Sequence, residues 1–247
     1  MSILQPYYRC VRPRKDLDYS EGGRWMYIIH KDYAPDAAHY IRAFELLQQD
    51  FLRLFEYIEP ADSNEGTYSF RCMEVLVRAC GEVESNCKAI LKANGYVRSE
   101  ESKMPDYRKL EVTHHLSSYS VRLPVWRGMQ AVRRPFALWA EGKSPTWYKD
   151  YHGVKHSRHE EFEKASFANV IDAMSGVVAL LASQFYTYDF KPQGWGTHIG
   201  QPDGGYEIAI GNYFHVRFPT NWNASDCYDF DWQALKSNPN PFQVLTF

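Results

Sequence analysis

Apolar residues recur every three or four positions along much of the chain, a spacing that is typical of helices. One stripe follows Pro35, a residue favoured in the first helical turn, and predicts a helix to about position 58. A second stripe predicts a helix from about Ser69 to Asn94-Gly95, where glycine can close a helix. The short segment 60–66 between the two stripes predicts an antiparallel helix pair.

A third and longer stripe predicts a helix from about Glu160 to Tyr186. At 1.5 Å per residue it would be roughly 40 Å long, enough to back a whole domain core. Before it, Ser144-Pro145 predicts the cap and first turn of another helical segment that reaches Tyr151. Residues 105–125 stay ambiguous between a short helix and a strand, and Pro124 argues against a central strand.

The last quarter of the chain changes from helical spacing to alternation. Residues 191–205 are rich in glycine and proline and predict a linker. The alternating apolar residues of 206–210 and 214–218 flank Gly211-Asn212, which predicts a β-hairpin with a tight turn. The segment after it carries many aromatic residues and turn formers, and we expect an irregular tail packed on the helices. Near the start, the apolar stretch from Trp25 to Ile29 suggests a short strand.

These patterns together predict a mainly α fold. We expect an antiparallel helical bundle with a small C-terminal β-hairpin and an irregular aromatic tail. Residues 1–34 would form an irregular N-terminal segment, residues 35–188 the bundle, and residues 189–247 the linker, hairpin and tail.

Composition narrows the setting in which such a bundle works. Apolar residues make up 45% of the 247 residues and charged residues 23%, which excludes wholesale disorder. A net charge of −2 gives no global attraction to nucleic acid or membrane. With neither a leader pattern nor a run of about 20 apolar residues, we expect a cytoplasmic chain without a membrane partner. The five cysteines have no CxxC spacing, which favours free, mostly buried thiols.

The richest candidate chemistry lies between Trp147 and His159. His152 and His156 are four residues apart and would share a helix face, with Lys155 and Arg158 beside them. Two imidazoles at this spacing can bind one metal ion, but a third ligand is not evident. Without a metal or other cofactor, the same residues could perform acid–base chemistry on a phosphate. The plain alternative is a set of structural polar residues near a helix start.

A second candidate is a basic, aromatic stretch. Residues 112–140 contain no Asp or Glu, but they contain four arginines interleaved with aromatic residues. Arginines next to aromatic rings can bind phosphates and stack on bases, which indicates a nucleic-acid interface. The residues expected to form it are Arg122, Trp126, Arg127, Arg133 and Arg134. Alternatively, these arginines pair with acidic residues of the tail or of the second helix, such as Glu74, Glu82 and Glu84.

Nucleophile elbows, P-loops and dinucleotide-binding glycine motifs are missing from the sequence. The phrase Tyr151-His-Gly-Val-Lys-His-Ser-Arg158 instead resembles the YN-x-x-KH signature that opens the last helix of HEPN-like helical domains. The resemblance covers about residues 36–188. It implies a helical bundle, often homodimeric and found in stress or phage-defence systems, and often a metal-independent ribonuclease with an Arg-x(4–6)-His pair.

The chain departs from that signature in two places. His152 stands where asparagine is usual, and the slots for arginine before His156 hold Lys149, Asp150 and Tyr151. The resemblance therefore implies an RNA- or nucleotide-associated protein in which His156 acts as general acid or base, with His152, Lys155 and Arg158 assisting. The alternative is a non-catalytic interaction or sensor module on the same scaffold.

Overall fold

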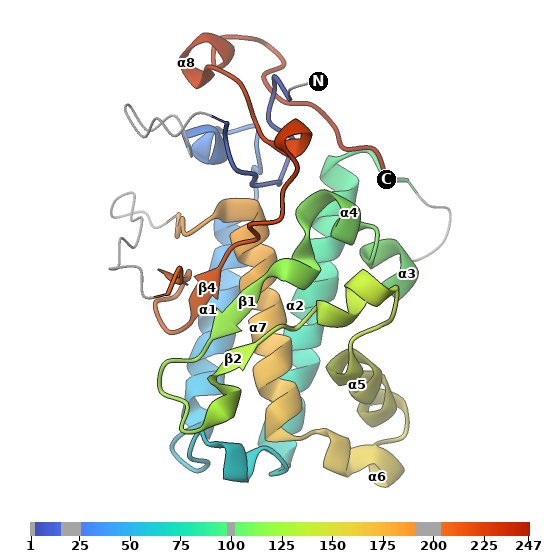
Figure 1. The fold of residues 1–247 in the computed structure, drawn as a ribbon. Helices are drawn as coiled ribbons and strands as arrows, with labels where there is room; N and C mark the ends of the chain where they lie inside the picture. The colour runs from blue at the N-terminus through green and yellow to red at the C-terminus, as the bar shows by residue number, and fades with distance from the viewer. Residues whose placement is uncertain (1–2, 16–25, 98–101, 191–203) are drawn as a thin grey trace.

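The computed structural model describes residues 3–15, 26–97, 102–190 and 204–247, and three long helices form its centre (Figure 1). These are α1 (Ala37–Leu54), α2 (Phe70–Ala93) and α7 (Phe167–Phe185). Helix α1 runs antiparallel to α2, as the sequence predicts, and α7 packs most extensively on α2. The mainly α fold with a small β part is confirmed.

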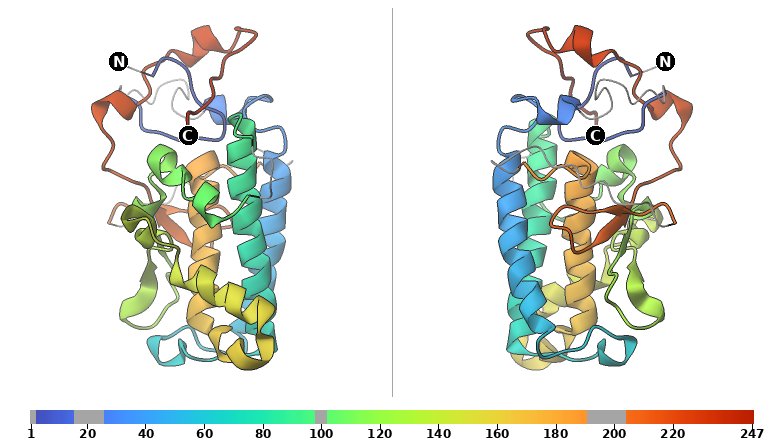
Figure 2. Two further views of the ribbon diagram at one scale, coloured as in Figure 1. Left: turned by 90° about the vertical axis from the view of Figure 1, so that its right-hand side faces the viewer. Right: turned by 90° about the vertical axis from the view of Figure 1, so that its left-hand side faces the viewer.

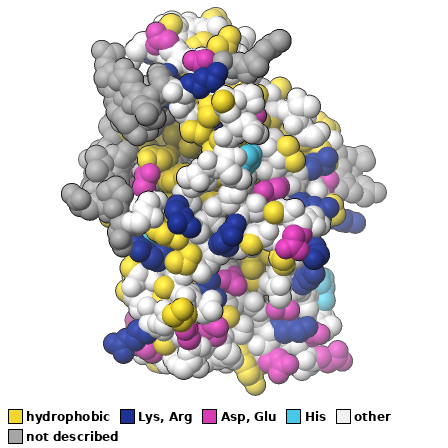
Figure 3. Space-filling model, in the orientation of Figure 1, with side chains coloured by type: hydrophobic (Ala, Val, Ile, Leu, Met, Phe, Trp, Pro, Cys, Tyr) yellow, Lys and Arg dark blue, Asp and Glu magenta, His cyan; other side chains and the backbone are white. Residues whose placement is uncertain are grey.

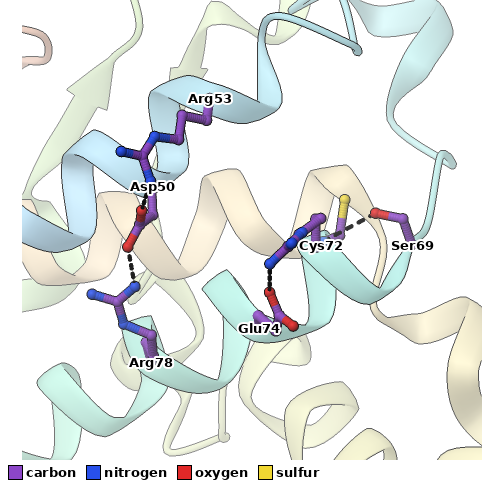
Figure 4. A network of polar contacts seen from close by, with 7 residues as sticks. Asp50, Arg53, Ser69, Cys72, Glu74 and Arg78 are labelled. Carbon is purple, nitrogen blue, oxygen red and sulfur yellow. Dashed lines mark hydrogen bonds and ion pairs between the residues drawn. The ribbon is translucent and has the colours of Figure 1, made fainter.

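The ends of α2 lie where the sequence places them. The Ser69 hydroxyl accepts a hydrogen bond from the Cys72 amide at 3.1 Å, and Gly95 follows the last turn with a φ of +76°. Figure 4 shows how α2 is joined to α1: Asp50 of α1 accepts a hydrogen bond from Arg53 on its own helix and forms an ion pair with Arg78 of α2. The Arg78 contact lowers the pKa of Asp50.

The predicted long helix is shorter than expected at its start. Helix α5 (Thr146–His156), helix α6 (Arg158–Glu161) and a 3-10 turn (Phe162–Lys164) precede α7, which begins only at Phe167. The Ser166 hydroxyl caps α7 by accepting a hydrogen bond from the Asn169 amide at 3.3 Å. Figure 2 shows α5 and α6 crossing the lower part of the bundle, where α5 packs on α2 and α7.

Helix α7 is the core of the bundle. It is long and apolar enough to cross a membrane by length and composition alone, but 83% of that stretch is buried inside the fold. Gly176 allows close packing, because a Cβ there would lie 3.4 Å from the rings of Phe136 and Trp147. Burial on all sides therefore accounts for the apolar character of α7.

The predicted hairpin is confirmed and belongs to a larger sheet. Strands β3 (Glu207–Ile208) and β4 (His215–Arg217) pair through a turn at Gly211, whose φ is +84°. Strands β1 (Ser120–Arg122) and β2 (Val132–Arg133) complete an antiparallel sheet of order β2-β1-β4-β3. The ambiguous segment thus supplies a central strand, with Pro124 just beyond its end. Val121 and Val216 stand opposite each other and are buried, and both strands contact α7.

The N-terminal segment and the C-terminal tail pair at one end of the bundle (Figure 1). Parallel bridges join Ile3 to Tyr228 and Tyr7 to Gln243. Asn94, at the end of α2, donates to the Tyr8 carbonyl at 2.9 Å and accepts from the Leu245 amide at 3.0 Å. The tail therefore packs partly on the N-terminal segment as well as on the helices.

The remaining elements are short. Residues Met26–Ile29 form a 3-10 helix, so the predicted strand at that place is wrong; Tyr27 turns inward there and packs against the aromatic rings of the tail. Short helices α3 (Met104–Tyr107), α4 (Leu110–His114) and α8 (Trp232–Leu235) complete the described secondary structure, together with several single 3-10 turns. The predicted linker falls almost wholly outside the described residues.

Candidate functional site

The four residues predicted for catalysis gather at the junction of α5 and α6. His152 and His156 are exposed on one face of α5, and their rings lie nearly parallel, at 12°, with centroids 5.9 Å apart. Lys155 is on the same last turn of α5, and Arg158 is the first residue of α6. We call these four residues the histidine surface.

The position of the histidine surface differs from the prediction. It lies at the C-terminal end of α5 and not at the start of α7. The carbonyl end of a helix carries partial negative charge, which opposes an anionic ligand. An anion at this surface must therefore be attracted by Lys155, Arg158 and the imidazoles themselves, against Glu160 and Glu161 in α6.

The environment of His152 is set by α2. The Tyr148 hydroxyl donates to the Glu84 carboxylate at 2.8 Å, and the Tyr148 ring lies edge-on to His152 with centroids 4.8 Å apart. Partial burial lowers the pKa of His152, and the nearby His156 and Lys155 lower it further, whereas Glu84 raises it. The net effect is a lower pKa, so His152 is a neutral imidazole at neutral pH.

The two cations of the histidine surface rest on aromatic rings. The Lys155 ammonium donates to the Tyr151 hydroxyl at 3.1 Å. The Arg158 guanidinium lies 5.9 Å from the ring centre of Phe70 at the start of α2. Phe70 is 58% exposed and contacts Phe162, which in turn contacts the half-exposed Tyr68. This exposed aromatic group next to Arg158 was not predicted, because Phe162 lies far in the sequence from Tyr68 and Phe70.

Two of the residues predicted to bind nucleic acid are used inside the fold. Trp126 is only 6% exposed, and its indole N–H donates to Asp62 at 2.6 Å. Arg133 lies over the Trp126 ring, pairs with Glu65 and lies 3.6 Å from Asp172. Neither side chain is free to stack on a base.

Of the other three predicted arginines, Arg127 and Arg134 are exposed and Arg122 is half-buried, and all three have partners within the fold. Arg127 pairs with Glu59 at 3.0 Å, and Arg134 donates to the Ser117 carbonyl at 3.0 Å. Arg122 contacts His215 and Tyr206 within the sheet region. The expected pairing with acids thus occurs for two of the arginines. Arg127 pairs with Glu59, and Arg133 pairs with Glu65 and Asp172, none of which belongs to α2 or the tail. Arg122 and Arg133 belong to β1 and β2, which lie apart from α5 and its histidine surface (Figure 1).

A second titratable cluster lies in the interior. Cys10 is fully buried; burial raises its pKa, but the neighbouring His114 and Arg12 outweigh this and bring the pKa to about 7. His114 is itself bound to the Arg9 carbonyl and the Thr113 hydroxyl, at 3.0 and 2.8 Å. Cys10 and His114 are both buried, so this cluster presents neither its thiol nor its imidazole to solvent.

A metal site is not formed within the described parts of the chain, where no three His, Cys, Asp or Glu side chains gather closely enough to hold an ion.

Comparison of the chain with family models, with curated proteins and with solved structures found no match.

Proposed function

We propose that the protein binds RNA at the histidine surface and cleaves it by metal-independent acid–base chemistry. The observation that carries this proposal is the pair of exposed, parallel imidazoles of His152 and His156, one of them held neutral and both flanked by cations. The resemblance of residues 151–158 to the HEPN-like signature supports RNA as the ligand.

The chemistry that this arrangement can perform is transesterification at the 2′-hydroxyl. Neutral His152 takes the proton of the hydroxyl, whose oxygen attacks phosphorus and displaces the 5′ oxygen of the next nucleotide. His156, as the general acid, gives a proton to that leaving oxygen, so the products are a 2′,3′-cyclic phosphate and a free 5′-hydroxyl. Lys155 and Arg158 stabilise the negative charge that develops on the phosphoryl oxygens.

The test is cleavage of a labelled single-stranded RNA in the presence of EDTA. We expect His152→Ala and His156→Ala each to lower the rate by about 100-fold or more, the usual contribution of a proton-transfer group. His159→Ala is the matched control, because His159 is also exposed but lies outside the pair. A substrate with 2′-deoxyribose at the scissile position should not be cleaved.

The pH profile gives a further check. His152 must be neutral to accept a proton, and its lowered pKa keeps it neutral below the pH at which an ordinary histidine protonates. The acidic limb of the rate profile should therefore lie below pH 6.5. Equal rates for wild type, His152→Ala and His156→Ala would exclude the proposed mechanism.

A second candidate is a non-catalytic interaction module. The exposed aromatic side chains of Tyr68 and Phe70 beside Arg158 favour it, because exposed aromatic residues are enriched at binding surfaces. Pure protein that turns over no RNA, but retains a partner protein that Phe70→Ala loses, would support this candidate.

A further inference from the structure

Two arginines of neighbouring strands lie against one tyrosine ring. The guanidinium carbon of Arg122 in β1 is 4.6 Å from the ring centre of Tyr206, and that of Arg217 in β4 is 5.1 Å from the same centre. Tyr206 is only 8% exposed, and its hydroxyl donates to Ser120 at 3.1 Å, so the ring is a fixed support. Both cations are therefore held at one place on the sheet.

The register of β1 and β4 puts these groups on the same face. Ser120 stands opposite Arg217, and Arg122 stands opposite His215. Residues in direct register, and residues two apart on one strand, share a face of the sheet. Val121 and Val216 are buried on the other face, so the two arginines, Ser120 and His215 belong to the outer face.

Hydrogen bonds orient each arginine. The Nε of Arg217 donates to the Ser120 hydroxyl at 3.2 Å. An Nη of Arg122 lies 3.2 Å from Nδ1 of His215, and because arginine can only donate, that ring nitrogen is the acceptor. Side chains restrained in this way lose little further freedom when they bind a ligand.

On this face, no carboxylate of the described residues neutralises the charge of Arg217. Within the described parts of the chain, the exposed Arg217 contacts a hydroxyl and a ring but no acidic group. Glu207 of β3 stands opposite Val216 and so belongs to the other face. Figure 3 shows Lys and Arg side chains gathered over β1 and β4. An oxyanion bound beside Arg217 would meet an exposed guanidinium that no carboxylate of the described residues neutralises.

We propose that Arg122 and Arg217 form a binding site for a phosphate group. Arg217 supplies the outward fork of N–H donors that matches a phosphate, Arg122 supplies the second charge, and Tyr206 and His215 position them. The phosphate belongs either to a small nucleotide or to an RNA backbone, which present the same oxygens. This site does not depend on the proposed cleavage, because its arginines belong to β1 and β4 and the two histidines belong to α5.

The experiment is calorimetric titration of the full chain with pyrophosphate and, separately, with an eight-nucleotide single-stranded RNA. We expect wild type to bind at least one of the two ligands with an affinity that falls as salt rises. Arg217→Ala should weaken that binding at least tenfold, and Arg217→Lys should restore part of it. Arg127→Ala is the matched control, because Arg127 is exposed but paired with Glu59, and it should bind as wild type.

The two titrations also separate the sources of the phosphate. If Arg217→Ala weakens the binding of pyrophosphate alone, the site takes a small nucleotide. If Arg217→Ala weakens the binding of RNA, the site contacts the RNA backbone. Since Arg217 is exposed, Arg217→Ala should have the same unfolding midpoint as wild type. If its midpoint is lower, the titrations are repeated with Arg217→Lys and Arg122→Gln. If the arginine variants bind both ligands as well as Arg127→Ala does, or if wild type binds neither ligand at millimolar concentration, the proposal is overturned.

Discussion

Asp172 of α7 shows how burial and a nearby cation compete at one residue. Burial raises the pKa of Asp172 from 3.8 to about 6, although Arg133 lowers it from 3.6 Å away, and the neighbouring Glu65 raises it further. Because the folded state holds this proton more tightly than the unfolded state, Asp172 loses stabilising effect as pH rises from about 4 to about 6.

Asp172→Asn should remove that pH dependence. Two pKa units correspond to about 3 kcal/mol, and we expect a smaller effect because the side chain is 29% exposed. The unfolding free energy of Asp172→Asn relative to that of wild type should be about 1–2 kcal/mol higher at pH 8 than at pH 4. The measurement is urea unfolding at both pH values. Glu59→Gln, which changes an exposed acid, should leave the pH difference as in wild type. An unchanged pH slope in Asp172→Asn would contradict the assignment.

Gly128 is a residue whose lack of a side chain is required. Its φ is +128°, and a Cβ would lie 2.3 Å from the carboxylate carbon of Asp62. That carboxylate accepts hydrogen bonds from Trp126, Met129 and Gln130 and so holds the loop before β2. These hydrogen bonds, that of Trp126 first, lower the pKa of Asp62.

Gly128→Ala should therefore destabilise the protein by about 1–3 kcal/mol, as expected for a strained backbone and a displaced carboxylate. Gly66→Ala is the control, since no atom lies within 4 Å of a Cβ at Gly66. Thermal unfolding followed by circular dichroism compares the two variants. A midpoint for Gly128→Ala as high as that of Gly66→Ala would show that the loop yields without cost.

At the scale of single residues, local spacing was informative and long-range pairing was not. The i, i+4 spacing placed His152 and His156 on one face, as the structure shows. No spacing could reveal that Arg133 meets Glu65 and Asp172, or that Arg217 shares Tyr206 with Arg122. Those partners come together only through the sheet and its packing on α7.

Helices were predictable where their ends carry local signals. Ser69 and Gly95 mark both ends of α2 because capping acts within a few residues. The start of α7 was missed because residues 158–164 are mostly polar helix formers and Phe162 among them continues the apparent apolar stripe. They fold as α6 and a 3-10 turn, and Ala165 leaves the helical conformation beside residues 65–67, where the Phe167 amide donates to the Thr67 carbonyl at 2.7 Å. The histidine surface therefore lies on α5, separated from the start of α7 by α6 and the 3-10 turn.

Ser69→Ala tests the cap of α2. Loss of its hydrogen bond to the Cys72 amide should cost about 1 kcal/mol of unfolding free energy. Ser85→Ala, in the exposed middle of the same helix, should be neutral or slightly stabilising, because alanine is the better helix former. Chemical denaturation of the two variants gives the comparison, and equal stabilities would show that the cap contributes nothing.

On the scale of the whole molecule, the described parts share one apolar core in which the two ends of the chain meet. Tyr228 is fully buried in the tail; its hydroxyl donates to the Cys10 carbonyl at 2.8 Å and accepts from the Tyr7 amide at 3.0 Å. The four-stranded sheet likewise joins residues about midway along the chain to residues near its end. The sequence indicated the hairpin of β3 and β4 and left residues 105–125, which contain β1, ambiguous. Strand β2 and the pairing of β1 with β4 leave no local pattern.

Tyr228→Phe should weaken the contact between the N-terminal segment and the tail. Removing the hydroxyl leaves a buried carbonyl and an amide without their partner, which costs about 1–3 kcal/mol. The matched control is Tyr57→Phe, because Tyr57 is 86% exposed and removal of its hydroxyl should not change the unfolding free energy. Guanidinium unfolding measures both free energies. If the two variants unfold at the same concentration, the hydroxyl does not hold the ends together.

The joining of Tyr7 to Tyr228 has a consequence for synthesis of the protein. The two residues are 221 positions apart, so on a translating ribosome the opening segment waits roughly 10–45 s for its partner at 5–20 residues per second. During that interval its tyrosines and the top of α2 are uncovered, whereas a chain refolding from denaturant offers both segments at once. Folding in the cell is therefore more dependent on protection of the nascent chain than refolding in the test tube would suggest.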